Sequence, residues 1–135
     1  MSLPESFQRN GWLLPGLLLL YFAASLLHFT HNAEYLGDYP NLPLSMTRGG
    51  VYLAWCGVTS IGVLGFLLYR SQWRIIGLAL LGIYAALGFD GLLHYTRAPM
   101  EAHTAAMNFT IWFEVVAAAL LLVAVLTLAA SRSPR

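Results

Sequence analysis

The stretch Trp12–Phe29, with the sequence WLLPGLLLLYFAASLLHF, runs for 18 residues without a charged side chain. A helix of about this length crosses the hydrocarbon core of a lipid bilayer, which is about 30 Å thick. Hydrophobic residues make up 59% of the 135-residue chain and charged residues only 10%, whereas soluble domains carry roughly a quarter charged residues. So few charges cannot cover a surface that faces water. We therefore expect an integral membrane protein, with the lipid bilayer as its solvent and partner.

Three further apolar stretches predict three further membrane helices. They are separated by a connector that contains Pro40 and Pro43, by the arginine-flanked turn 70–74, and by a loop that contains Pro99. Proline disrupts a helix interior, and arginine beside aromatic residues is typical of a membrane surface. The predicted fold class is an all-α four-helix transmembrane bundle in a single domain, residues 1–135, with helices at about 12–35, 47–69, 75–96 and 104–130.

The first apolar stretch has a competing interpretation as a cleaved secretory signal. Arg9 precedes its leucine-rich core, and the small residues Ala23, Ala24 and Ser25 follow. The stretch is nevertheless long enough to span a bilayer. We therefore expect it to remain as the first transmembrane helix.

The arginine residues predict an orientation in the membrane. All seven basic residues are arginine, and five of them lie in the first ten residues, the 70–74 turn and the C-terminal tail. Arginine-rich loops stay in the cytoplasm, so we expect a bacterial inner-membrane protein with both termini cytoplasmic and the other two loops periplasmic. The net charge of only +1 argues against a nucleic-acid partner. A homo-oligomer and a subunit of a larger membrane complex both stay open as states of assembly.

A short pattern occurs twice in the chain. Residues 26–30 read LLHFT and residues 92–96 read LLHYT, 66 residues later, and Gly16 and Gly82 keep the same offset. This pattern predicts two tandem helical hairpins, related by an axis along the membrane normal. The alternative is a chance similarity between two helix ends. Under either interpretation, His28 and His94 end outward-running helices at the same membrane depth.

Ionisable side chains inside the apolar stretches are the strongest functional signal, because a charge in hydrocarbon costs at least about 2.5 kcal/mol. Asp90 lies four residues before His94, so one helix face would carry both. A polar stripe with spacings of 4, 3 and 4 runs from His103 to Glu114. An acid at that depth must be neutral, paired, or facing a polar cavity. We predict Asp90 and Glu114 as acid–base residues, and the structural alternative is that they brace the helices through hydrogen bonds.

The four histidines of the chain all fall near the predicted outer end of the bundle. Imidazole binds zinc, copper and iron, and carboxylates can complete the coordination shell. The leading hypothesis is a transition-metal site there, which would be a metal-dependent membrane enzyme if one coordination position stays open. No compact signature such as HExxH is present, so the hypothesis depends on clustering alone. The predicted metal ligands are His28, His31, His94 and His103.

Three other functions stay open at this point. His28 and His94, at matching positions, could bind one haem from both sides. The alanine-rich fourth helix could pack against a partner in a non-catalytic accessory subunit. A proton-coupled transporter would use Asp90 and Glu114 as proton carriers, with Gly88–Gly91 as the place where a helix could unwind.

Overall fold

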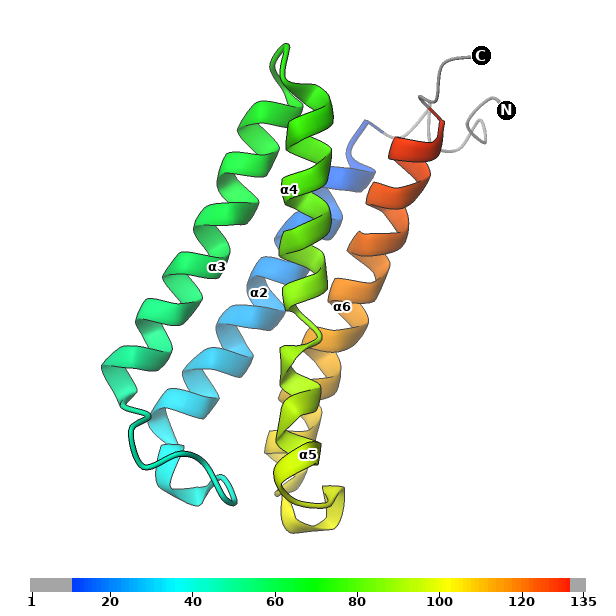
Figure 1. Cartoon of the computed structure of the whole chain (residues 1–135). Helices are drawn as coiled ribbons and strands as arrows, with labels where there is room; N and C mark the ends of the chain where they lie inside the picture. Colours follow the sequence, from blue (N-terminus) through cyan, green and yellow to red (C-terminus); the bar gives the residue numbers. More distant parts are fainter. Residues whose placement is uncertain (1–10, 132–135) are drawn as a thin grey trace.

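The computed structural model describes residues 11–131, in which the chain forms helices, turns and loops but no strand. Four long helical segments lie side by side, and both described chain ends lie at one end of the molecule (Figure 1). All four are long and apolar enough to span a membrane, which confirms the all-α fold and indicates an integral membrane protein. The predicted leader, residues 1–10, and the tail from residue 132 lie outside the described part of the chain. The segments are α2 (Leu13–Glu34), α3 (Arg48–Tyr69), the third span (Arg74–Arg97) and α6 (Ala105–Ala130).

Threonine side chains fix where α3 and α6 begin. Thr47 accepts a hydrogen bond from the Gly50 amide over 3.0 Å, and Thr104 accepts one from the Met107 amide over 3.2 Å. The first amides of a helix have no partner within the helix, and a capping hydroxyl supplies one. The observed starts of both helices therefore lie one residue after a threonine.

Each long helix packs against two neighbours. α2 contacts α3 and α6, and α4 (Arg74–Leu87) also contacts α3 and α6, so the helices close a ring (Figure 1). Apolar side chains around Tyr21, Leu81 and Leu121 fill the half of the ring nearest the α3–α4 turn. Polar side chains gather in the other half, beside the loops 35–47 and 98–104, and we call this half the loop end.

Glycine lets α3 and α4 approach closely beside their connecting turn. A Cβ atom at Gly77 would lie 2.1 Å from the backbone nitrogen of Tyr69, and one at Gly65 would lie 3.1 Å from that of Leu81. Small residues at helix interfaces permit this backbone contact. Away from the turn the two helices diverge, so that α3 is separated from the third span at the loop end (Figure 1).

The third span is interrupted where the sequence predicts one helix over 75–96. α4 ends at Leu87, a 3-10 segment η2 (Asp90–Leu93) follows, and α5 (His94–Arg97) resumes the α-helix. A Cβ atom at Gly88 would lie 2.5 Å from the Cβ atom of Ala118, so only glycine permits this path of the chain. The interruption lies at Gly88–Gly91, where the sequence suggests that a helix could unwind, and the segments on both sides of it still form one candidate span. The break places Gly91 in the interior of the loop end.

Candidate histidine–carboxylate site

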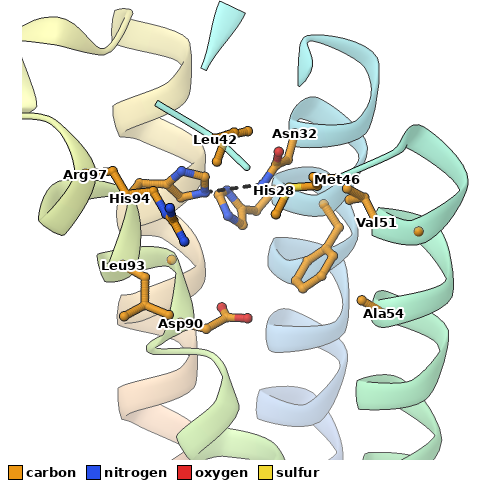
Figure 2. A pocket seen from close by; sticks show the side chains of 13 residues that line it. His28, Asn32, Leu42, Met46, Val51, Ala54, Asp90, Leu93, His94 and Arg97 are labelled. Atoms are coloured by element: carbon orange, nitrogen blue, oxygen red, sulfur yellow. Dashed lines mark hydrogen bonds between the residues drawn. The ribbon is translucent and has the colours of Figure 1, made fainter. Parts of the chain in front are cut away.

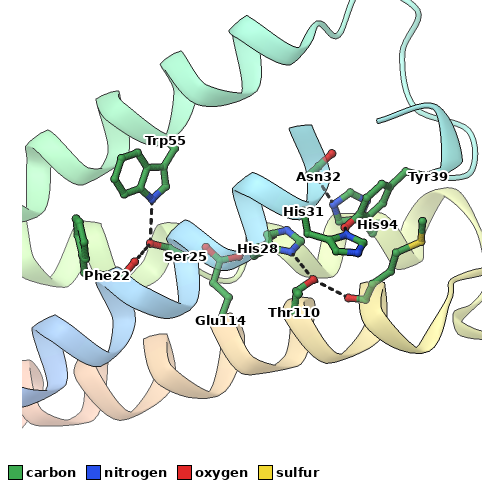
Figure 3. A network of polar contacts seen from close by, with 11 residues as sticks. Phe22, Ser25, His28, His31, Asn32, Tyr39, Trp55, His94, Thr110 and Glu114 are labelled. Carbon is green, nitrogen blue, oxygen red and sulfur yellow. Dashed lines mark hydrogen bonds and ion pairs between the residues drawn. The ribbon is translucent and has the colours of Figure 1, made fainter. Parts of the chain in front are cut away.

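Glu114 is the most deeply buried acid in the described part of the chain, with 0% of its surface exposed. Within residues 11–131 neither of its carboxyl oxygens has a hydrogen-bond partner. Its nearest ionisable neighbour is His28, whose Nε2 lies 3.6 Å from Oε2 of Glu114 (Figure 3). A buried acceptor without a donor costs about 1–3 kcal/mol, and more if it is charged. Glu114 therefore requires a positive partner or a proton of its own.

The hydrogen bonds around His28 determine which of its nitrogens carries the proton. The Thr110 hydroxyl donates to the Met107 carbonyl over 3.0 Å, so its oxygen is an acceptor for His28 Nδ1 at 3.3 Å. Nδ1 of His28 is then protonated, and the neutral ring has a lone pair on Nε2. That lone pair faces the Glu114 carboxyl group. Two acceptors thus face each other in a buried site, and a positive charge between them would satisfy both.

His94 lies beside His28 at the same end of the bundle. The two rings meet edge to face with centroids 5.5 Å apart, and Tyr39 packs on the other side of His94 at 4.8 Å. His94 Nε2 lies 3.3 Å from the Asn32 amide nitrogen, while its Nδ1 is buried and finds no partner in residues 11–131. The structure therefore brings together the two histidines of the repeated pattern.

His103 is oriented by a backbone carbonyl. Its Nδ1 lies 3.0 Å from the carbonyl oxygen of Pro99, which can only accept, so Nδ1 carries the proton. Nε2 of His103 then carries the lone pair that could bind a metal ion, and it is buried without a hydrogen-bond partner among the described residues. Metal-binding histidines are commonly oriented in this way. The His103 ring lies 6.1 Å from the ring of His94, so it is the outer member of the three buried histidines.

His31 is only partly buried and makes different contacts from the three buried histidines. Its ring stacks on Tyr35 with centroids 4.7 Å apart, and its Nδ1 lies 2.8 Å from the Tyr39 hydroxyl. Burial raises the pKa of Tyr39 to about 12, so this hydroxyl stays protonated and forms a hydrogen bond with His31. The predicted ligand His31 therefore links α2 to the loop that follows it, outside the cluster of buried histidines.

Asp90 and His94 do not share one helix face. Residues four apart in a 3-10 segment are displaced by about 120°, instead of by the 40° of an α-helix. Asp90 Oδ1 is buried and has no hydrogen-bond partner in residues 11–131. Both side chains nevertheless line the same pocket. Asp90 accepts no hydrogen bond from His94 in the described part of the chain.

The pocket at the loop end has a volume of about 250 Å³. It lies between α2, the start of α3 and the broken third span, and the Asp90 carboxyl group is turned into it (Figure 2). Its apolar wall includes Val51, Ala54 and Leu93. The polar residues that line it are His28, Asn32, Asp90, His94 and Arg97.

Other polar residues of α3 have partners away from Glu114. Arg48 and Tyr52 both donate to Oε1 of the exposed Glu34, over 2.8 and 2.7 Å, and Trp55 donates to Ser25 over 3.2 Å. These contacts link the end of α2 to the start of α3. They leave His28 as the nearest basic group to Glu114.

Nitrogen and oxygen atoms that could bind a metal ion lie close together at the loop end, but they do not form a complete coordination shell. Within residues 11–131 no three His, Cys, Asp or Glu side chains are grouped closely enough to hold a metal ion in this conformation. A haem between His28 and His94 is also not preformed, because the two nitrogens of His28 face Thr110 and Glu114. No protein family, curated protein or solved structure matches the chain. The geometry of the site is therefore the basis for assigning a function.

Two members of the site could not be identified from sequence patterns. Tyr39 lies in a proline-containing loop, and no periodicity indicates that its ring packs on His94. Gly91 lies against the pair, since a Cβ atom there would be in van der Waals contact with it, 3.5 Å from Oε2 of Glu114 and 3.7 Å from Nε2 of His28. A glycine directly after the intramembrane Asp90 is the only sequence signal for this close approach.

Proposed function

We propose that this protein binds a divalent transition-metal ion between His28 and Glu114, inside the membrane-spanning bundle. The observation that carries the proposal is the separation of 3.6 Å between His28 Nε2 and Glu114 Oε2. A direct hydrogen bond would be about 2.7–3.2 Å long. Two ligands at about 2.0–2.2 Å from one tetrahedral metal ion are separated by about 3.4 Å. The observed separation of His28 Nε2 and Glu114 Oε2 is therefore closer to that of two ligands of one metal ion than to a hydrogen bond.

The surroundings of the pair support a larger coordination shell. His94 and His103 each contribute a buried nitrogen with no partner in residues 11–131, and the Asp90 carboxyl group lies at the same end of the bundle. A side-chain rotation of His94 would turn a second imidazole towards the ion, and Gly91 lies directly beside the pair. Imidazole with carboxylate suits zinc, iron and copper.

An ion held by few protein ligands would keep positions for water or a substrate. A bound divalent ion lowers the pKa of coordinated water and polarises a substrate oxygen. Asp90 is the ionisable group placed to exchange a proton with a molecule in the pocket, since its carboxyl group is turned into that space (Figure 2). The proposed role is a metal-dependent membrane enzyme acting on a substrate that enters this pocket.

The proposed location is a bacterial inner membrane, with both termini in the cytoplasm. The support is the arginine distribution, in which Arg70 and Arg74 lie at the α3–α4 turn and Arg48 and Arg97 at the loop end, while Arg9, Arg132 and Arg135 flank the four spans. The loop end, and with it the metal site, would then face the periplasm.

Cobalt binding in the visible spectrum tests the metal proposal. The purified protein in lipid nanodiscs is titrated with Co²⁺, whose absorption bands appear when it enters a site of low symmetry. We expect saturable bands for the wild type and none for Glu114→Gln, whereas Glu101→Gln, which alters an exposed acid, behaves as the wild type. Absence of bands in the wild type, together with an infrared band of a protonated carboxyl group that Glu114→Gln removes, would overturn the proposal. His28 and Glu114 would then share a proton.

A further inference from the structure

The pocket at the loop end presents acceptor atoms without donors. Oδ1 of Asn32 and Oδ1 of Asp90 are both buried, and neither has a hydrogen-bond partner in the described part of the chain. Both residues line the pocket, and Asn32 is only 9% exposed. Native proteins rarely leave such oxygens unpaired. A molecule that brings hydrogen-bond donors into the pocket would satisfy both acceptors.

The wall of the pocket formed by α3 is apolar. Val51 and Ala54 on α3 present hydrocarbon to the pocket, and so does Leu93, on η2 beside Asp90. Ligand pockets commonly combine an apolar lining with a few polar groups that orient the ligand. A fitting molecule is therefore amphipathic, with its polar head near Asn32 and Asp90 and its apolar body against α3.

The surroundings of the pocket indicate entry from the bilayer. α3 diverges from the third span at the loop end (Figure 1), and the pocket lies between them. Leu53 on α3 is 74% exposed and Leu93 on η2 is 58% exposed. Because lipid is the expected neighbour of these apolar side chains, a molecule dissolved in the membrane meets the pocket from the side.

We propose that this pocket binds a small membrane-soluble molecule with a hydrogen-bond-donating head group, either a hydroxyl or an ammonium group. The head contacts Asp90 and Asn32, and the apolar body fills the space beside Val51 and Ala54. The volume of about 250 Å³ is slightly below the range of drug-sized ligand sites, about 300–1,000 Å³, which favours a single ring or a short chain. This is the pocket that the proposed function assigns to the substrate, but the contacts of the head group with Asp90 and Asn32 do not require the metal ion.

Three probes that share one ring test the chemistry of the head group. Cyclohexanol and cyclohexylamine carry donors, whereas cyclohexanecarboxylate presents only acceptors at neutral pH. Binding is measured by calorimetry on the full chain in nanodiscs with a chelator present, and empty nanodiscs give the blank for partitioning into lipid. We expect saturable binding of the alcohol and the amine, each at least about tenfold tighter than the carboxylate. Equal or tighter binding of the carboxylate would overturn the proposal.

Substitutions locate the binding within the pocket. Ala54→Phe should abolish binding of both donor probes, because the added ring fills the space beside α3. Ile83→Phe is the matched control, since Ile83 is 51% exposed on α4 and does not line the pocket. Asp90→Leu should weaken the binding of both donor probes at least about tenfold, because the carboxylate that accepts their hydrogen bond is lost. Unchanged probe binding in a folded Ala54→Phe or Asp90→Leu protein would contradict the assignment of the binding site to this pocket. Because the chelator removes metal ions, these results do not depend on the outcome of the metal titration.

Discussion

Nε2 of His28 lies 3.6 Å from Oε2 of Glu114, and both side chains are buried where α2 packs against α6. The Thr110 hydroxyl fixes the proton of His28 on the opposite nitrogen, so the lone pair of Nε2 faces the Glu114 carboxyl group. With Glu114 ionised, this arrangement is costly unless a metal ion or a proton lies between the two atoms. The metal proposal and the first two predictions below follow from this relationship.

Stability should respond to metal ions through Glu114. Removal of the buried acid by Glu114→Gln should leave the metal-free protein at least as stable as the wild type, because a neutral amide costs less to bury than a carboxylate. Metal should stabilise only the wild type, by about 2.7 kcal/mol at a free concentration about 100 times the Kd. Thermal unfolding of both proteins with and without Zn²⁺ measures this, and equal stabilisation of the two would contradict the role of Glu114.

The histidines should differ in their contribution to metal binding. His94→Ala should reduce Zn²⁺ affinity at least about tenfold, since it removes the imidazole nearest the pair. His31→Ala should leave the affinity unchanged, because His31 lies outside the cluster and contacts Tyr35 and Tyr39. Competition with a coloured zinc chelator gives both values. If His31→Ala weakens binding more than His94→Ala does, the ligand set is wrong.

The α3–α4 contact should be sensitive to a single methyl group. Gly77→Ala would place its Cβ atom 2.1 Å from the Tyr69 backbone nitrogen and should lower the free energy of unfolding by about 1–3 kcal/mol or more. Gly57→Ala is the control, since nothing lies within 4 Å of a Cβ atom there and alanine favours a helix over glycine. Unfolding in a mixed detergent series compares the variants, and equal effects would argue against the close approach of the helices.

The Tyr39 hydroxyl should ionise at a higher pH than an exposed tyrosine does. Its ionisation should lower the free energy of unfolding at high pH. Burial raises its pKa from 10.0 to about 12, so its neutral form is favoured in the folded protein. The resulting stabilisation is complete below pH 10 and decreases as the pH rises from about 10 to about 12. The difference between the ultraviolet titrations of the wild type and Tyr39→Phe isolates this group. Ionisation of Tyr39 near pH 10 in the folded protein would contradict its burial against His94.

Sequence patterns alone predict the bounds of three helices and part of the candidate site. Long apolar runs predict α2, α3 and α6 to within one residue at each end, because a membrane span needs a minimum length whatever its packing. The stripe from His103 to Glu114 also predicted an interior acid, since helical spacing fixes which residues share a face. Both features depend only on local periodicity.

The remaining parts of the site depend on contacts between distant segments. Helical spacing places His28 and His31 on one face of α2, yet His31 forms its hydrogen bond with the loop residue Tyr39. The interruption after Leu87 follows from the crowding of Gly88 against Ala118. That interruption turned Asp90 away from the face of His94. The contact between Tyr39 and His31 has no signature within a single helix, whereas Gly88 and Gly91 mark the place of the interruption in the sequence.

The most direct test of the central claim is the metal content of the protein purified from membranes without added metal or chelator. Elemental analysis of the wild type should find about one zinc, iron or copper ion per chain, as a single His28–Glu114 site requires. His28→Gln, purified in parallel, should contain less than about a tenth of that amount. A wild-type protein that contains no stoichiometric metal and cannot be loaded with Zn²⁺ or Co²⁺ would contradict the claim.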